Sequence, residues 1–420
     1  MIVNILIFLA GLVIYAGYGW VGLAYLLGAT ALSYLAGLLI PKHRWVMWLS
    51  VAANAAVLVI VKLQPVTGWE FLAPMGLSYF TLQIISYNVD IYKGRFAPER
   101  NLFRYGLYIT YIPHLFVGPI ERYDQMGPAL FENRRITWDG ISAGAMRAVW
   151  GLFKKFVIAA RAGQVVSAIS ANPESLTGAY ALFAMVMYSI QLYADFSGGI
   201  DMVLGGSRML GITLSENFDA PYFSQSFQEF WRRWHITLGS WLRNYIYIPL
   251  GGNRKGKARK TLNLIITFLV SGLWHGIHYL LWGLVNGIFV AVGEKLKTPC
   301  KFLNQAVTFL LVSLLWSFFV WPDALTAVKM VGSVFTTFNY GALAAGILEL
   351  GLNVGEWIVL IMAVALLWVC DVFREKLRAR FAAMSPAARV AVVGVLGLVV
   401  LVFGMYGIGF NAEEFIYSRF

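Results

Sequence analysis

Long apolar runs separated by short polar stretches make up most of this chain. A helix needs about 20 mainly apolar residues to cross the hydrocarbon core of a bilayer. The clearest segments of this kind are residues 3–17, 20–40, 45–62, 178–194, 303–320, 353–372 and 388–410. Less purely apolar helices are expected at 72–92, 102–120, 141–170 and on both sides of residues 271–283. The pattern predicts an all-α polytopic membrane protein with about ten or eleven membrane-embedded helices, several of them interrupted.

Composition supports a membrane protein of one domain. Of the 420 residues, 59% are hydrophobic and only 13% are charged, which lies outside the usual range of soluble domains. No long polar tract separates the apolar runs, so residues 1–420 are expected to form a single membrane domain. The first 20 residues lack a basic region and a small-residue cleavage site, which favours a retained first span. Cys300 and Cys370 match no metal or redox spacing and are given no role.

The formal net charge of +12 is concentrated in loops. Basic residues cluster at 42–44, 254–260, 295–301 and 374–380. Because cytoplasmic loops of membrane proteins carry an excess of Lys and Arg, these clusters predict the cytoplasmic side of a multi-pass protein in the cell (inner) membrane. Lipid headgroups, rather than nucleic acid, are the expected partners of this charge.

The sequence SGLWHGIHYLLWG, residues 271–283, places two histidines in an apolar run. If the clusters at 254–260 and 295–301 are both cytoplasmic, the segment between them enters the membrane and returns. Its first arm, 261–274, would be about 21 Å long, shorter than a ~30 Å hydrocarbon core. Irregular backbone at that depth must be packed in protein or line a cavity. We therefore expect Trp274, His275, Gly276 and His278 deep in the protein, with His275 at a cavity and His278 as a hydrogen-bonded core residue.

A metal or haem site at these histidines is the less favoured alternative. His275 and His278 are three residues apart and would share a helix face, but zinc needs a third ligand. A two-histidine haem site would need a histidine on a facing helix, for which only His114 is available. We expect no metal.

A second candidate segment is ENFDAPYFSQSFQEFWRRWHITLGSWLRNYIYIPLGGNRKG, residues 216–256. It is too charged to span a membrane and rich in the Trp, Tyr and Arg that suit the headgroup region. Arg232, Arg233 and Arg243 indicate the cytoplasmic interface, and His235 lies among them. An interfacial helix without chemistry would explain the aromatic content but not the Pro-Leu-Gly-Gly turn that follows.

Two aspartates occur in QLYADFSGGIDMVLGG, residues 191–206. Asp195 and Asp201 are expected to end or interrupt the apolar helix. A carboxylate inside a membrane costs roughly 2.5–3.5 kcal/mol on insertion scales, so it normally meets a partner or a wet cavity. Arg232 or Arg233 is the expected partner. Ion pairing and substrate contact both remain open for Asp195.

Two further functional classes compete. GISAG, residues 140–144, matches the Gly-x-Ser-x-Gly nucleophile elbow, but that motif needs a preceding strand, whereas a polar loop precedes Ser142 and a helix follows it. We therefore predict that this match is false. Midplane charges and broken helices are also typical of transporters. The sequence shows no repeated half, which disfavours transport.

Several of these segments resemble one known family, in order along the chain. They are PMGLSYFTLQIISYNVDIYKG (74–94), YIPHLFVGPIERY (111–123), QLYADFSGGIDM (191–202), the segment 216–256, SGLWHG (271–276) and FIYSRF (415–420). Together they resemble the bacterial membrane-bound O-acyltransferases that include the alginate and peptidoglycan O-acetylation membrane proteins. Asn244 stands where relatives often have aspartate, and FIYSRF differs from the commoner FIYFQF.

The resemblance implies a fold and a set of roles. The fold would be a ring of tilted helices around a thinned central funnel. His275 would be the catalytic histidine, within a Trp-His-Gly motif that includes Trp274, and His235 the second family histidine. Substrate contacts are expected from Trp274, Arg232, Arg233, Arg243, Asn244 and Asp195, with the arginines suited to the phosphates of coenzyme A.

The resemblance also implies substrates and partners. The acyl donor would be cytoplasmic acetyl-CoA, acting as a substrate and not as a bound cofactor. The acetyl group would pass to an extracytoplasmic acyltransferase partner that modifies a polysaccharide. D-alanyl transfer from a carrier protein to teichoic acid is the alternative, disfavoured because the early motifs of those relatives differ from GLSYFTLQIISYNVDIY, residues 76–92.

Overall fold

The computed structural model describes residues 2–68, 73–131, 135–293, 297–321 and 323–406. Within these ranges the chain is helical apart from loops, and its only β-pairing is an isolated antiparallel bridge between Phe218 and Trp234. The helices of the first half are α1 (Ile2–Gly17), α2 (Trp20–Leu39), α3 (Trp45–Thr67), α4 (Leu77–Tyr92), α5 (Leu102–Thr110), α6 (Ile112–Val117), α7 (Tyr123–Phe131), α8 (Trp138–Phe153), the π-helix η1 (Lys154–Ala159), α9 (Ala160–Ser170) and α10 (Ala179–Met209). Those of the second half are η2 (Pro221–Phe223), α11 (Phe227–Arg233), α12 (Ile236–Leu242), the π-helix η3 (Arg243–Tyr247), α13 (Gly256–His275), η4 (Ile277–Tyr279), α14 (Leu280–Val292), α15 (Lys301–Leu315), α16 (Ser317–Val320), α17 (Ala324–Thr336), α18 (Tyr340–Gly346), η6 (Ile347–Glu349), α19 (Val354–Ala383) and α20 (Pro386–Phe403).

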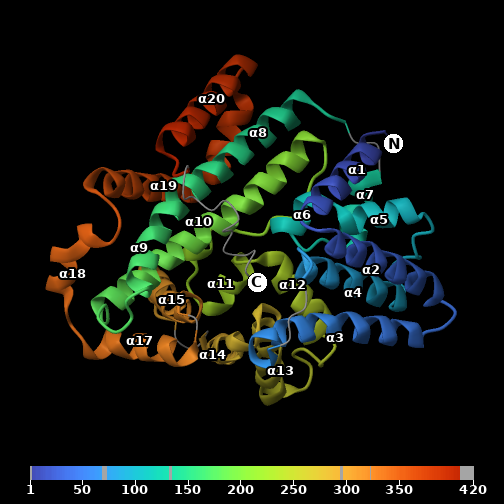
Figure 1. Cartoon of the computed structure of the whole chain (residues 1–420), viewed down its shortest axis with the longest axis horizontal. Helices are drawn as coiled ribbons and strands as arrows, with labels where there is room; N and C mark the ends of the chain where they lie inside the picture. The colour runs from blue at the N-terminus through green and yellow to red at the C-terminus, as the bar shows by residue number, and fades with distance from the viewer. Residues whose placement is uncertain (1, 69–72, 132–134, 294–296, 322, 407–420) are drawn as a thin grey trace.

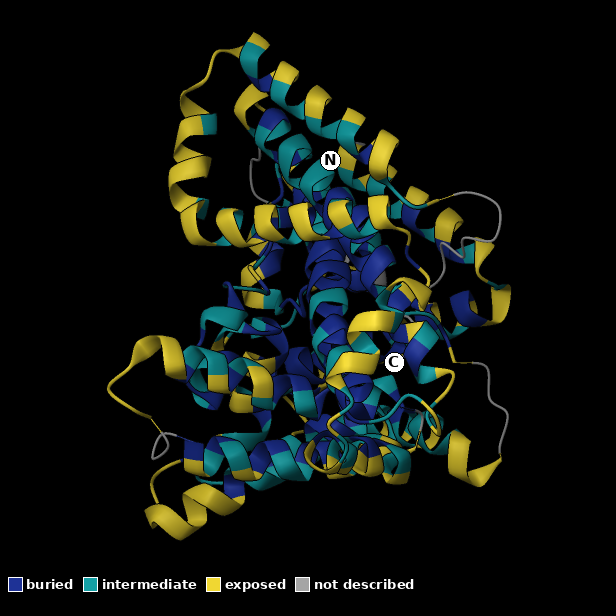
Figure 2. Ribbon diagram, turned by 90° about the vertical axis from the view of Figure 1, so that its left-hand side faces the viewer, coloured by how far each residue is buried: buried dark blue, intermediate teal, exposed yellow. Residues whose placement is uncertain are grey.

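A long helix pair crosses the molecule, and the other helices surround it. The helical segment α8–η1–α9 lies beside α10 (Figure 1). In this view α1 to α7 lie to the right of this pair, and α13, α14, α15 and α17 lie below it. The short helices α11 and α12 lie between these groups. Buried residues concentrate in the middle of the molecule and exposed ones at its periphery (Figure 2). The core therefore lies where the segment 216–256 meets α10 and the α13–α14 hairpin.

The apolar helices confirm a multi-pass membrane protein. Among the described residues, five helices are long and apolar enough to span a bilayer: α2, α3, the α15–α16 segment Lys301–Val320, α19 and α20. A further pair, Ala324–Thr336 and Tyr340–Glu349, passes the same test together but bends by 108°. α1 is a shorter apolar helix, and the segment 102–120 is broken into α5 and α6. The total of ten or eleven embedded helices stays a prediction. Residues 407–410, the end of the last predicted span, lie outside the described residues.

Helices α8 and α10 touch through their glycines. A Cβ added to Gly144 would lie 2.5 Å from the carbonyl oxygen of Gly205, and one on Gly205 would lie 2.5 Å from the carbonyl oxygen of Gly144. About two helical turns away, Gly151 of α8 and Gly198 of α10 face each other in the same way. Small residues at such spacings let helix backbones approach closely inside membranes. The predicted helix at 141–170 is therefore correct, and its packing against α10 depends on residues with no side chain.

The same helix pair buries charge. Lys155 Nζ lies 2.7 Å from Asp195 Oδ1, and Lys154 Nζ lies 2.5 Å from Asp201 Oδ2. Arg147 Nε donates to Asp201 Oδ1 at 2.8 Å, while its Nη atoms hold both carboxylate oxygens of Glu216. The lysines lie on the π-helix η1, a local irregularity frequent at functional positions.

These pairs correct two predictions. Asp195 and Asp201 neither end nor interrupt their helix, since α10 runs through both of them from Ala179 to Met209. Their partners are Lys155, Lys154 and Arg147, and not Arg232 or Arg233. A helix can continue past a buried carboxylate where a cation on the adjacent helix compensates its charge.

Replacing Gly144 with leucine should destabilise the protein. The new side chain would collide with the backbone of α10, and overpacking of this kind costs about 1–3 kcal/mol. The measurement is the thermal unfolding midpoint in detergent. Gly206→Leu is the matched control, because a Cβ there meets nothing within 4 Å. Equal midpoints for the two variants would contradict the close approach of α8 and α10.

Replacing Asp195 with alanine should destabilise the protein by about 3–5 kcal/mol, because it leaves the buried Lys155 ammonium without its carboxylate. The double variant Asp195→Ala/Lys155→Met removes both charges and should recover most of that loss. Thermal unfolding of the single and double variants tests this. A double variant no more stable than Asp195→Ala would contradict the unpaired Lys155 ammonium as the cause of the loss.

Candidate active site

The α13–α14 hairpin carries the first candidate histidine at its apex. α13 ends at His275, and Gly276 follows with φ +143°, a conformation that side chains rarely adopt. A Cβ on Gly272 would lie 2.5 Å from the carbonyl oxygen of Tyr279, so glycine allows the two arms to close tightly. The hairpin was predicted correctly. Its first arm, however, begins at Gly256 and not at 261, because the basic residues form its opening turns. At 1.5 Å per residue the arm is about 30 Å long, which equals the thickness of the hydrocarbon core. The prediction of a short first arm is therefore wrong.

His275 is buried and surrounded by aromatic rings. Trp274, Trp282 and Phe319 meet the imidazole edge-on, with ring centroids 4.7, 5.5 and 5.7 Å away. Trp274 is itself anchored to the backbone, since its Nε1 donates to the carbonyl oxygen of Ser78 at 3.4 Å. The ring of Trp274 also packs against the imidazole of His235, with ring centroids 6.2 Å apart. Trp274 thus lies against both candidate histidines.

His278 does not lie with His275. The helix ends at His275, and the 3₁₀ turn of η4 directs His278 to the surface, where it is exposed. The predicted deep position of His278, its role as a core residue and the shared helix face are therefore wrong. Among the described residues no group of three or more His, Cys, Asp or Glu could hold a metal ion. The side chain of His114, like Lys295 and FIYSRF (415–420), lies outside what the structure describes.

His235 lies at a strained point of the backbone. It precedes α12 with φ 45° and ψ 53°, a left-handed conformation that is uncommon for residues other than glycine and concentrates at functional sites. The surrounding backbone holds it there. Asp219 N donates to the carbonyl oxygen of Arg233 at 2.9 Å, and Ile236 N donates to that of Asn217 at 3.0 Å. His235 is 2% exposed, so the segment 216–256 is not merely an interfacial helix.

Asn217 determines which nitrogen of His235 carries the proton. Its Oδ1 lies 3.3 Å from His235 Nδ1 and also accepts hydrogen bonds from Thr237 N at 3.0 Å and Thr237 Oγ1 at 2.9 Å. Because an amide oxygen can only accept, Nδ1 of His235 must be the donor. In the neutral ring Nε2 then carries the lone pair. Asn217 is therefore a positioning residue for His235.

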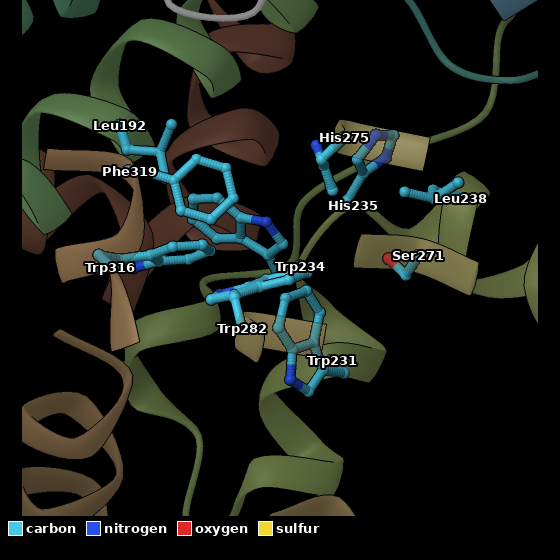
Figure 3. A pocket seen from close by; sticks show the side chains of 10 residues that line it. All are labelled: Leu192, Trp231, Trp234, His235, Leu238, Ser271, His275, Trp282, Trp316 and Phe319. Atoms are coloured by element: carbon cyan, nitrogen blue, oxygen red, sulfur yellow. The ribbon is translucent and has the colours of Figure 1, made fainter. Parts of the chain in front are cut away.

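Both histidines line one small cavity of about 20 Å³ (Figure 3). A cavity needs roughly 10–15 Å³ on this measure to hold one water molecule, so the space admits about one water-sized group. Its lining comes from α10, α11, α12, α13, α14, α16 and their ends: Leu192, Trp231, Trp234, His235, Leu238, Ser271, His275, Trp282, Trp316 and Phe319. The structure thus brings together His275 and His235, which are 40 residues apart in the chain.

The predicted substrate-binding residues are not part of the cavity wall, although Trp274 lies against both histidines. Arg232 and Arg243 are exposed, and Asn244 is half-buried. Arg233 pairs with Glu229 at 2.7 Å and donates to the carbonyl oxygen of Asp219 at 3.2 Å. None of these four residues, nor Asp195 or Trp274, is among the residues lining the cavity.

The segment 216–256 also contacts the basic end of α19. Arg374 pairs with Asp219, and Arg378 Nη2 lies 3.9 Å from Glu216. The predicted cytoplasmic cluster at 374–380 and the predicted cytoplasmic segment are therefore on the same side of the molecule.

Ser142 is not a nucleophile elbow. It lies inside α8, where its Oγ accepts a hydrogen bond from Arg389 Nη1 at 3.1 Å. No strand precedes it among the described residues. The prediction that GISAG is a false match is confirmed.

Most of the residues that line the cavity were not predicted from the sequence. Ser271, Trp282, Trp316 and Phe319 all contribute to the cavity wall, and Asn217 positions His235. Ser271 precedes His275 by one helical turn, a spacing that places both on one helix face and was available in the sequence. For Trp316 and Phe319 no local signal exists, because they lie in another span.

Comparisons with known proteins agree on one family. Residues 45–337 match the membrane-bound O-acyltransferase (MBOAT) family. A probable alginate O-acetylase of Pseudomonas putida is 34% identical over 428 residues, covering 94% of this chain and 87% of that protein. A peptidoglycan O-acetyltransferase of Helicobacter pylori is 34% identical over 298 residues, covering 62% of this chain and 56% of that protein. A teichoic acid D-alanyltransferase of Streptococcus thermophilus is 28% identical over 280 residues, covering 63% of this chain and 67% of that protein.

The family match covers the helices that build the cavity, including both histidines and the whole α13–α14 hairpin. It disfavours a transporter without acyl chemistry. The chain therefore belongs to the membrane-bound O-acyltransferase family and is a multi-pass membrane acyltransferase.

Proposed function

We propose that this protein takes an acetyl group from acetyl-CoA on the cytoplasmic side and passes it across the membrane for O-acetylation of an exported or cell-surface polysaccharide. The observation that carries the proposal is the pair His275 and His235 in one small, mostly aromatic cavity. A thioester is already activated, so the protein must remove a proton from the acceptor hydroxyl and stabilise the developing oxyanion.

His275 is proposed as the general base. It takes the proton of the acceptor hydroxyl while the hydroxyl oxygen forms a bond to the thioester carbonyl carbon. The carbon–sulfur bond then breaks, and the leaving thiolate of coenzyme A receives the proton. Covalent acylation of His275 before transfer is the alternative. The cavity admits only about one water-sized group, so a bound thioester would leave little room for water, which protects it from hydrolysis.

His235 is proposed to orient the thioester or relay a proton. The hydrogen bond to Asn217 leaves its Nε2 as an acceptor in the neutral ring. Because the ring is held by Asn217 on one side and meets Phe196 edge-on at 4.9 Å, it has little freedom to rotate. A fixed ring is what orientation of a substrate group requires.

Acetyl is favoured over D-alanyl by the relatives. Curated alginate O-acetylases are 33–38% identical to this chain, whereas teichoic acid D-alanyltransferases are 25–28% identical.

The location and partners follow from this proposal. The protein would lie in the cytoplasmic membrane, with Arg232, Arg233 and Arg243 near the entrance for the phosphates of coenzyme A. Arg232 and Arg243 are exposed and so accessible to a donor. An extracytoplasmic acyltransferase partner would deliver the group to the polysaccharide.

Replacing His275 with alanine should lower transfer by about 10²–10⁴-fold, the usual contribution of a general base. The measurement is release of free thiol from acetyl-CoA by the purified protein, with the acceptor fraction present and absent. His278→Ala is the matched control, because His278 is three residues away but exposed, and it should keep full activity. Substantial turnover by the His275→Ala protein would exclude His275 as the base.

Replacing Arg243 with alanine should raise KM for acetyl-CoA about ten-fold with kcat nearly unchanged, because a phosphate contact contributes equally to the ground and transition states. Arg380→Ala, a change at an exposed arginine of α19, is the control and should leave KM unchanged. Identical KM values for both variants would place the donor phosphates elsewhere.

A further inference from the structure

The cavity has a polar side and an aromatic side. The side with the polar groups holds the two imidazoles, the side chain of Ser271 and also Leu238. The other side is mostly aromatic and holds Leu192, Trp231, Trp234, Trp282, Trp316 and Phe319 (Figure 3). An acyl thioester has the same division, with a carbonyl that seeks hydrogen bonds and an alkyl group that does not. The carbonyl is therefore expected to face the histidines, and the alkyl group the indoles.

The size of the space limits the alkyl group. About 20 Å³ accommodates one water-sized group, and a methyl group is of similar size. A longer chain would have to displace aromatic rings that are already packed. Close-packed interiors resist this, because forcing in extra methylene groups drives side chains out of their rotamers.

Trp316 closes the cavity on its aromatic side. It lies at the break between α15 and α16 and is 3% exposed. Its ring stacks on Trp282 with centroids 6.1 Å apart at 20°, and it packs against Trp234 at 5.3 Å and Phe319 at 5.4 Å. Trp282 in turn contacts His275. Trp316 thus lines the end of the cavity away from His275, and Trp282, Trp234 and Phe319 hold its ring in place.

Open space lies behind the segment that carries this ring. Leu315 and Phe318 alternate with Trp316 and Phe319 along the chain, and they line a different, wholly apolar cavity of about 250 Å³ between α14, α15 and α17. The break between α15 and α16 therefore separates a small space at the histidines from a large one that has no polar lining side chain. The size of the reactive cavity is set by this wall and not by a general lack of room in the protein.

We propose that Trp316 is the specificity residue that restricts the acyl donor to two carbons. This inference rests on the proposed acyl transfer at His275. Removing the indole enlarges the aromatic end of the cavity without touching either histidine, so it should admit a longer acyl group while the acetyl reaction continues.

The test compares thiol release from acetyl-, butyryl- and hexanoyl-CoA by the unchanged protein, Trp316→Ala and Trp321→Ala. Trp321 is a matched control, since it is a fully buried tryptophan five residues away that lines neither cavity. The unchanged protein and Trp321→Ala should strongly prefer acetyl. Trp316→Ala should raise kcat/KM for butyryl relative to acetyl by about ten-fold or more, as expected when methylene groups gain a pocket.

The possible outcomes separate this inference from the proposed function. Acetyl turnover by Trp316→Ala with an unchanged butyryl-to-acetyl ratio would overturn the role of Trp316 and leave acyl transfer standing. An unchanged protein inactive with all three thioesters would instead overturn the proposed donor, and this inference with it. If Trp316→Ala does not elute as a folded monodisperse species, Trp316→Phe serves in its place. Its smaller ring should admit propionyl-CoA, and an acetyl-only Trp316→Phe protein would contradict the proposal.

Discussion

The compensation of buried charge between η1 and α10 is the constraint on which this structure depends. Lys154 and Lys155 are buried, and Asp201 and Asp195 meet them from the adjacent helix. The glycines of α8 and α10 bring the two backbones close enough for this. An unpaired ion there would cost several kcal/mol. The two helices are therefore held in one register, and this register fixes the position of the segments that pack against α10.

The active-site cavity is positioned from this pair. Leu192 and Phe196 of α10 reach the cavity and the His235 ring, and the carbonyl oxygen of Ser189 accepts a hydrogen bond from Tyr222 at 2.7 Å. One turn along the same helix from Ser189, Tyr193 donates to Asp371 of α19 at 2.7 Å. A single helix thus connects the segment that carries His235 to the helices of the membrane domain.

The two histidines are held by different physical means. His275 lies at the end of a regular helix whose hairpin needs glycine at 272 and 276, and its ring is confined by aromatic packing. His235 lies in a strained left-handed conformation stabilised by backbone hydrogen bonds and by Asn217. Packing suits the first ring because the surrounding space is apolar. Hydrogen bonding suits the second because a strained backbone needs directional contacts to persist.

The sequence by itself determined the membrane class, the helical hairpin, the two histidines and the family, because hydrophobic runs and short motifs are local properties of the chain. It did not determine the partners of Asp195 and Asp201, since a buried carboxylate shows only that a cation is needed and not which one. It also placed His278 in the interior, because apolar neighbours in sequence do not reveal where a helix ends and a 3₁₀ turn begins. The wall of the cavity combines Trp282 of α14 with Trp316 and Phe319 of the α15–α16 segment. Only tertiary packing decided this, because it brings together segments that are distant in sequence and that no local pattern relates.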